Sequence, residues 1–258
     1  MSGVDRPAEE PRHRPGAPPE LGVLVLAAGR GSRIAGLAGA TPKPLLDVAG
    51  RSLLGWNLRW LGEWGVDTVW INLHHGAGAI RSALGQEAEG VRLRYSQEEE
   101  ILGTAGGWRR LAEHWRATSL VVYGDNFMRF DLTLLLAAHR AAGRSATVAL
   151  YDPDRHTCTS GTGGRVRVTG NAVSAFREGG HDPDGAHVNA GVYLLEPEVA
   201  AAVPPGFADF GHDVLPGLAA AGRLTAHILE DGAFCLGLDT PERFAAAQQL
   251  VASGRVGA

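Results

Sequence analysis

The stretch LVLAAGRGSRIAGLAGATPKPLL, residues 24–46, holds the features that decide how the rest of the chain folds. It begins within a continuous apolar run, Val23 to Ala27, which is typical of a strand buried on both faces of a parallel sheet. Gly29 and Gly31 follow the run, and glycine lets the backbone adopt a positive φ and approach a ligand closely. Successive backbone N–H groups in such a turn can bind an anion. The stretch therefore predicts a buried strand that ends in an anion-binding turn.

The glycine pattern of this turn differs from two common nucleotide-binding fingerprints. The pattern GxxxxGK[ST] is absent, so the turn is not a P-loop, and the third glycine of GxGxxG would fall at Ile34. An ordinary strand-to-loop turn could carry the same two glycines. The glycines alone therefore leave the role of the turn open.

Lys43 lies directly before Pro44 and is the only lysine among the 24 basic residues of the chain. Arginine presents a planar fork, whereas lysine is a compact charge on a flexible stem. A site that needs a slim cation inside a cluster of phosphates would favour lysine. The alternative is a single surface lysine without a role, and the sequence around Lys43 argues against it.

The segments LAAGRGSR and TPKPLLDVAGRSLL closely resemble the N-terminal signature of sugar-1-phosphate nucleotidylyltransferases, in particular mannose-1-phosphate and heptose-1-phosphate guanylyltransferases. That signature reads G-x-G-[ST]-R, a spacer, and P-K-P, and the matching residues here are Gly29, Gly31, Ser32, Arg33, Pro42, Lys43 and Pro44. The resemblance implies an α/β fold, a Rossmann-like three-layer sandwich with a mostly parallel mixed sheet. It also implies that Arg33 and Lys43 neutralise the triphosphate and the leaving pyrophosphate. The nucleotide contacts that it implies in this stretch are Leu26, Ala27, Ala28, Gly29, Gly31 and Ser32.

Composition limits the class of protein. The 258 residues are 45% hydrophobic, which is enough for a large core, and the net charge of -4 argues against a nucleic-acid partner. Two cysteines are too few for a disulfide scaffold and fit a reducing, cytoplasmic location. No apolar run of about 18 residues occurs, so we expect no membrane partner.

The resemblance covers nearly the whole chain after residue 20. Residues 1–20 contain five prolines and no apolar signal region, and we interpret them as a disordered tail, with a strap over the domain as the alternative. Residues 21–258 are then one nucleotidyltransferase catalytic domain. Its expected parts are a nucleotide-binding part over about 21–130, a sugar-phosphate-binding part over about 131–240 and a closing helix over 241–253.

Hydrophobic periodicity places the helices and strands. It predicts helices over 52–64, 77–84, 132–142 and 242–251, and strands over 68–73, 91–95, 120–123, 146–150, 165–169, 172–176, 188–195 and 224–229.

The segment SQEEEILGTAGGW, residues 96–108, has three glutamates followed by a Gly/Thr turn. The simplest interpretation is an acidic loop that Thr104 caps. However, E-x-L-G-T-A-G is similar to the base-recognition segment of mannose-1-phosphate guanylyltransferases, which implies that Glu100, Leu102, Gly103 and Thr104 bind the base. A carboxylate or carbonyl would accept hydrogen bonds from guanine, and the purine would lie flat on the glycines. We therefore expect GTP, with uridylyl, thymidylyl and cytidylyl transfer as alternatives.

The strand predicted over 120–123 ends in Gly124, Asp125 and Asn126. A carboxylate at the carboxyl end of a strand in an open α/β sheet lies where ligands bind, although an Asx turn would show the same residues. The resemblance implies that Asp125 binds Mg²⁺ and that Gly124 lies beside the nucleotide. Mg²⁺ usually takes one or two carboxylates together with substrate phosphates.

The segment AFREGG, residues 175–180, resembles the F-x-E-K-P segment that holds the sugar phosphate. Glu178 matches the glutamate, but the lysine falls on Gly179, so we expect Arg177 to take its role, with Arg165 as the second candidate. The segment VNAGVYLL, residues 188–195, is similar to the family's N-A-G-x-Y strand. The resemblance implies that Asn189 and Gly191 face the sugar.

Two further segments depart from the family pattern. In the stretch that begins at Asp209, Gly211 stands where the family has a glutamate, and in CLGLDTPERF, residues 235–244, Gly237 stands where it has a second metal-binding aspartate. Asp239 could reach the metal from two residues later, or it could cap the helix that starts at Pro241. Both interpretations stay open.

The implied reaction is attack of a sugar-1-phosphate on the α-phosphorus of an NTP, with Mg²⁺ as cofactor. The glycines at positions 179, 211 and 237 motivate a competing interpretation, an inactive regulatory subunit that binds a sugar nucleotide. The intact Arg33, Lys43 and Asp125 argue against it. The sequence does not name the sugar or the oligomeric state, for which a homodimer is one candidate.

Overall fold

The computed structural model describes residues 20–29, 41–158, 163–179 and 187–256. The tail predicted over 1–20, apart from Glu20, and the predicted site residues Gly31, Ser32 and Arg33 lie outside the described residues.

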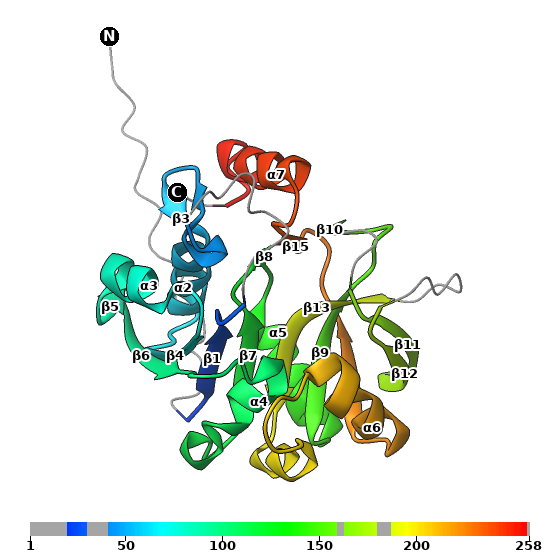
Figure 1. The fold of residues 1–258 in the computed structure, drawn as a ribbon. Coiled ribbons are helices and arrows are strands. Elements are labelled where there is room, and N and C mark those ends of the chain that lie inside the picture. Colours follow the sequence, from blue (N-terminus) through cyan, green and yellow to red (C-terminus); the bar gives the residue numbers. More distant parts are fainter. Residues whose placement is uncertain (1–19, 30–40, 159–162, 180–186, 257–258) are drawn as a thin grey trace.

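A mixed sheet of ten strands forms the centre of the molecule (Figure 1). Its strands are β1 (Gly22–Leu26), β4 (Thr68–Leu73), β5 (Glu87–Ala88), β6 (Val91–Gln97), β7 (Ser119–Tyr123), β9 (Ala146–Tyr151), β11 (Arg165–Thr169), β12 (Ala172–Arg177), β13 (His187–Leu195) and β14 (Leu224–Ile228). They follow the order β11-β12-β14-β9-β13-β7-β1-β4-β6-β5. Strands β7, β1, β4 and β6 run parallel, while β13 runs antiparallel to both β7 and β9. The expected α/β class with a mixed sheet is thereby confirmed.

Helices cover both faces of this sheet and make three layers (Figure 1). The first face packs against α2 (Leu53–Glu63), α3 (Ala77–Leu84) and α5 (Leu132–Ala142). The second face packs against α4 (Gly103–Arg109), the 3-10 helix η4 (Pro197–Ala202), the π-helix η5 (Phe210–Val214) and α6 (Leu215–Ala220). The alternation of a strand explains the division, because Val23 and Val25 of β1 join the first core and Leu24 joins the second.

A smaller unit packs beside the main sheet and holds its own core. It consists of a sheet in the order β10 (Thr157–Cys158), β15 (Phe234–Gly237) and β8 (Asn126–Arg129), covered by α7 (Pro241–Ala252). The hairpin of β2 (Asp47–Val48) and β3 (Arg51–Ser52) lies next to it, since Val48 belongs to the same core. The sequence analysis predicted α7 but neither β8 nor β15. These strands are four residues long, too short to show a clear period.

The longer helices and strands agree closely with the periodicity. Strand β4 and helices α3 and α5 have the predicted bounds, and the helix predicted over 52–64 is α2 with Ser52 as its N-cap. Ser52 Oγ accepts a hydrogen bond from the backbone N of Gly55 at 3.0 Å. Within α2, Trp60 is buried and donates from Nε1 to the carbonyl of Phe130.

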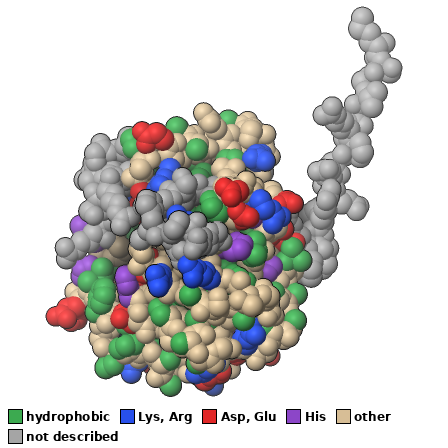
Figure 2. Space-filling view, turned by 90° about the vertical axis from the view of Figure 1, so that its right-hand side faces the viewer, with side chains coloured by type: hydrophobic (Ala, Val, Ile, Leu, Met, Phe, Trp, Pro, Cys, Tyr) green, Lys and Arg blue, Asp and Glu red, His purple; other side chains and the backbone are tan. Residues whose placement is uncertain are grey.

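The surface carries charges of both signs. On the face that Figure 2 shows, acidic and basic side chains are interspersed. Among the described residues, no helix is both long enough and apolar enough to span a membrane.

Helix α5 offers a test of the fold, because one aspartate caps it. Asp131 Oδ1 accepts from the backbone N of Thr133 at 2.8 Å and of Leu134 at 3.4 Å. Asp131→Ala removes these acceptors and should lower the free energy of unfolding by about 1 kcal/mol, measured by urea denaturation. Asp131→Asn keeps a capping oxygen and should stay close to wild type. Equal losses in the two variants would contradict the capping role.

Candidate functional site

A pocket of about 280 Å³ lies at the carboxyl ends of the parallel strands β1, β4, β6 and β7. Ligands bind at this edge in open α/β sheets. The residues that line it are Leu26, Ala27, Ala28, Gly29, Lys43, Pro44, Asn72, Ile101, Gly103, Thr104, Tyr123, Asp125, Phe207 and Asp209. The pocket thus brings Lys43 and Asp125 together with the two segments that are expected to bind nucleotide.

Three of the predicted nucleotide-binding residues in the described part of the chain do not line this pocket. Glu100 is exposed, and Leu102 is half-buried with its carbonyl bound to the backbone N of Ala208. Gly124 is buried, and its backbone N donates to the carbonyl of Leu26. A contact of Glu100 with the base stays a prediction.

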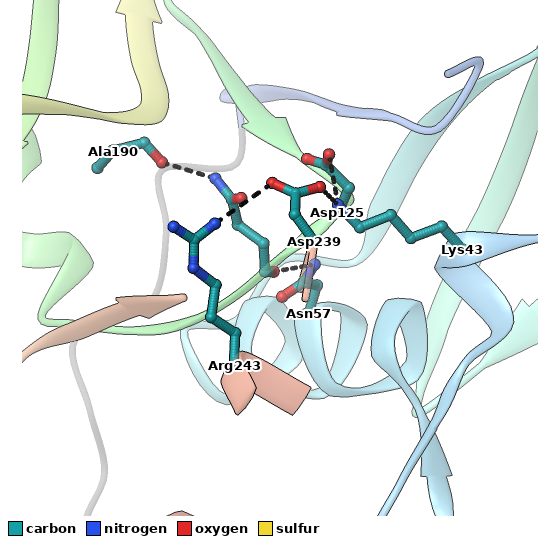
Figure 3. Close-up of polar contacts among 7 residues, drawn as sticks. Lys43, Asn57, Asp125, Ala190, Asp239 and Arg243 are labelled. Carbon is teal, nitrogen blue, oxygen red and sulfur yellow. Dashed lines mark hydrogen bonds and ion pairs between the residues drawn. The ribbon is translucent and has the colours of Figure 1, made fainter. Parts of the chain in front are cut away.

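Lys43 lies between two carboxylates (Figure 3). Its Nζ atom is 3.0 Å from Asp125 Oδ2 and 2.7 Å from Asp239 Oδ1. The residue begins a short 3-10 helix, Lys43–Leu45, and the prolines on both sides restrict the backbone there. Only 6% of Lys43 is exposed. The lone lysine is therefore a buried cation at the base of the pocket, and a surface role is wrong.

Pairing between β8 and β15 brings Asp239 to Asp125. Gly237 of β15 lies opposite Asn126 of β8, the residue after Asp125, and the backbone N of Leu238 donates to the carbonyl of Asp125. Asn126 is fixed in turn, because its side chain donates to the carbonyl of Ala190 and its own carbonyl accepts from Asn57 (Figure 3). The small sheet thus sets the separation of the two carboxylates.

The structure separates the two interpretations of Asp239. Thr240 is the N-cap of α7, and its Oγ1 accepts from the backbone N of Arg243 at 3.4 Å. Asp239 instead faces Lys43, and its second oxygen lies 3.8 Å from the guanidinium of Arg243 (Figure 3). Gly237 is buried within β15. A role of Asp239 as a metal ligand stays a prediction.

A buried polar network at the pocket was not expected from the sequence. Asn72 Oδ1 accepts from the backbone N of Ala27, and Asn72 Nδ2 donates to Glu98 Oε1, both at 2.8 Å. Glu98 Oε2 accepts from the backbone N of Leu102 at 3.0 Å. Glu98 is only 2% exposed, whereas Glu100 is exposed. Adjacent glutamates look alike in the sequence, so only the fold shows which one is structural.

A second polar network extends from the pocket toward the predicted sugar-binding residues. Asn189 Nδ2 donates to the hydroxyl of Tyr193 at 2.7 Å, and Asn189 Oδ1 accepts from the backbone N of Gly191 at 2.9 Å. The hydroxyl of Tyr193 donates to that of Tyr123, which lines the pocket. Burial raises the pKa of both tyrosines, so both stay neutral.

Glu178 occupies space that the glycine at position 211 leaves free. A Cβ atom on Gly211 would overlap Glu178 Oε2, and a Cβ on Gly164 would lie 2.7 Å from the same oxygen. Burial and the charge of Asp209 raise the pKa of Glu178, while His212 opposes the shift. Arg177 is exposed and does not line the pocket, so its contact with a sugar phosphate stays a prediction.

Comparison with protein families gives one match over most of the chain. The profile of the family described as nucleotidyl transferase matches residues 22–251. The match includes β1, the pocket segments, Asp125 and Asp239.

Two curated relatives are each 30% identical to this chain. One is a UTP–glucose-1-phosphate uridylyltransferase from Synechocystis, aligned over 77% of this chain and 55% of its own length. The other is a mannose-1-phosphate guanylyltransferase from Mycobacterium tuberculosis, aligned over 87% of this chain and 63% of its own length. The chain thus spans a little over half of each relative.

The fold also matches solved structures. HddC from Yersinia pseudotuberculosis superposes with a TM-score of 0.75 at 23% identity, over 90% of this chain and 99% of HddC. A second HddC structure is complexed with GMP-PN and gives the same TM-score. At this identity the likeness shows a shared fold.

The raised pKa of Glu178 predicts a pH dependence of stability. The folded state binds the proton of Glu178 more tightly than the unfolded state does, so protonation of this carboxyl stabilises the fold. This contribution to the free energy of unfolding is complete below the ordinary pKa of 4.5 and is lost as the pH rises through the raised pKa. Glu178→Gln cannot titrate, so its melting temperature relative to wild type should rise between about pH 4 and pH 7. Differential scanning fluorimetry measures the difference, with exposed Glu87→Gln as control. A pH-independent difference would refute the assignment.

Proposed function

The chain belongs to the nucleotidyl transferase family, and we propose on this basis that it transfers a nucleoside monophosphate from an NTP to a sugar-1-phosphate, releasing pyrophosphate. The observation that carries the proposal is the pocket that Lys43 and Asp125 line together with residues 26–29, Ile101, Gly103 and Thr104, with Asp239 as the second carboxylate bound to Lys43. Both curated relatives carry names of this reaction class.

The chemistry requires two polyanions to meet in line, and no covalent intermediate with the protein is needed. Catalysis then comes mostly from positioning and from neutralisation of charge. Lys43 is the buried cation available for this within the described residues that line the pocket. Its carboxylate partners hold the ammonium in place, and it would exchange them in part for phosphate oxygens when substrate binds. Arg33 would add a second cation.

The donor set of Asp125 and Asp239 fits a magnesium ion. Both carboxylates point toward one position, which the ammonium of Lys43 occupies, and Mg²⁺ prefers oxygen ligands from one or two carboxylates with substrate phosphates. Within the described ranges, no group of three or more His, Cys, Asp and Glu side chains could hold a metal alone. Oxygens of the nucleotide and of water would complete the coordination of such a metal, and when bound it would withdraw charge from the α-phosphate.

We infer GTP as the preferred nucleotide. Two observations support this. The segment 100–106 is similar to the base-recognition segment of guanylyltransferases, and one relative is a guanylyltransferase. The uridylyltransferase relative keeps UTP as the competing candidate. Pyrophosphate release, measured for five NTPs against a panel of sugar-1-phosphates, decides between them. Nucleotide binding without release across the panel would favour the inactive, regulatory alternative.

Replacing Lys43 tests the catalytic role. Lys43→Arg and Lys43→Met should each lower kcat/KM on the order of 100- to 1,000-fold, because the larger planar guanidinium does not match the buried position of a compact ammonium and methionine carries no charge. Pyrophosphate release measures the loss, and thermal unfolding checks that the variants fold. Arg155→Lys, an exposed site, is the matched control. Turnover of Lys43→Arg at the wild-type rate would refute the role.

Replacing Asp125 tests the metal proposal. Asp125→Asn keeps the shape of the side chain but removes a charged ligand, so it should weaken binding of Mn²⁺ in the presence of GTP by at least about ten-fold. Electron paramagnetic resonance of free Mn²⁺ measures binding without any need for turnover. Asp154→Asn, at an exposed turn, should bind like wild type. Unchanged Mn²⁺ affinity in Asp125→Asn would remove Asp125 from the metal site.

A further inference from the structure

The segment 206–210, which we name the strap, docks on the segment 102–106. The carbonyl of Ala208 accepts from the backbone N of Ala105 at 3.0 Å and of Gly106 at 3.1 Å, and the backbone N of Ala208 donates to the carbonyl of Leu102 at 2.9 Å. The strap therefore satisfies N–H groups in the first turn of α4, which lack partners within the helix.

Side chains strengthen this docking. Thr104 Oγ1 donates to Asp209 Oδ1 at 2.9 Å and accepts from the backbone N of Phe210 at 2.8 Å. Thr104 therefore binds the strap and does not cap α4, whose N-cap is Leu102. Phe210 is fully buried in the second core and fixes the far end of the strap.

The glycines of the LGTAG segment make this approach possible. A Cβ atom on Gly103 would overlap the carbonyl oxygen of Ala208, and a Cβ on Gly106 would lie 2.6 Å from the carbonyl oxygen of Gly206. Gly103 also has a φ of +75°, which disfavours other residues. From the sequence, Gly103 was expected to bind the base, and the purine was expected to lie flat on the glycines of this segment. The structure shows that both also receive the strap.

The strap places an aromatic ring at the pocket. Phe207 lines the pocket together with Ile101 and Gly103, and its Cε2 atom would lie 3.2 Å from a Cβ on Gly103. It is 62% exposed, more than any other large hydrophobic side chain in the described residues. Exposure of such a ring is unfavourable in water, yet the hydrogen bonds of Ala208, Asp209 and Phe210 hold the backbone directly after it in place.

We propose that Phe207 is a platform for the nucleobase of the bound NTP. Phe207 shares its pocket with the segments expected to bind nucleotide, whereas Arg177, Glu178, Asn189 and Gly191, the residues expected to bind the sugar phosphate, do not line it. A nucleobase has a flat π-face that stacks on an aromatic ring, and stacking tolerates any base. The inference rests on the proposed function, because it requires an NTP in the pocket.

The experiment measures nucleotide binding without an acceptor. Phe207→Ala should raise the Kd for both GTP and UTP by about ten-fold in isothermal titration calorimetry, and Phe207→Tyr should keep the wild-type value. Pyrophosphate, which carries no base, should bind equally well to Phe207→Ala and wild type. Leu134→Ala is the matched control, because Leu134 is the other exposed large hydrophobic residue described and lies on α5.

The outcomes separate this inference from the proposed function. Unchanged nucleotide Kd in Phe207→Ala, or a rise only in the KM for the sugar-1-phosphate, would overturn the platform and leave the proposed function intact. Equal weakening of GTP and pyrophosphate would also overturn it, because the loss would then not depend on a base. Absence of nucleotide binding by the wild-type protein would overturn both.

Discussion

The charge of Lys43 is the constraint on which the site depends. Two carboxylates converge on one ammonium at 2.7 and 3.0 Å, and without that cation two negative charges would face each other at the edge of a buried core. The arrangement requires the prolines around Lys43, the carboxyl end of β7 for Asp125, and the β8–β15 pairing for Asp239. Together these elements fix the positions of one cation and two anions at the pocket.

A second connection between distant segments also lies at the pocket, where the strap contacts the start of α4. The strap leads into η5 and lies on the start of α4. Thr104, in the segment expected to bind the base, is therefore hydrogen-bonded to Asp209, which also lines the pocket. Glu98 and Asn72 anchor the same segment from below. Its position is therefore set by buried polar contacts as well as by apolar packing, and such contacts are costly to leave unpaired.

The sequence predicted the parts of the fold that depend on neighbouring residues. Strand β4 and helices α3 and α5 follow from period and turn residues, and Lys43 and Asp125 follow from composition and from resemblance. Contacts between distant segments were not predictable. Strands β8 and β15 are too short to show a period of their own. Glu98 differs from Glu100 only in that the fold buries it. Phe207 looks like an ordinary loop residue in the sequence, and only the close contacts of its neighbours with Gly103 and Gly106 place it at the pocket. The alternatives for Asp239 separated only when Thr240 proved to be the cap.

The β8–β15 pairing also has a consequence for the order in which the protein matures. Strand β8 follows β7 directly, whereas its partner and Asp239 lie near the carboxyl end of the chain. During synthesis on the ribosome, the amino-terminal strands, Lys43 and Asp125 emerge long before Asp239, and contacts between distant segments form late. A nascent chain therefore carries an ammonium with a single carboxylate partner and an open edge on β8. The charge balance of the centre is complete only when β15 and Asp239 have been made.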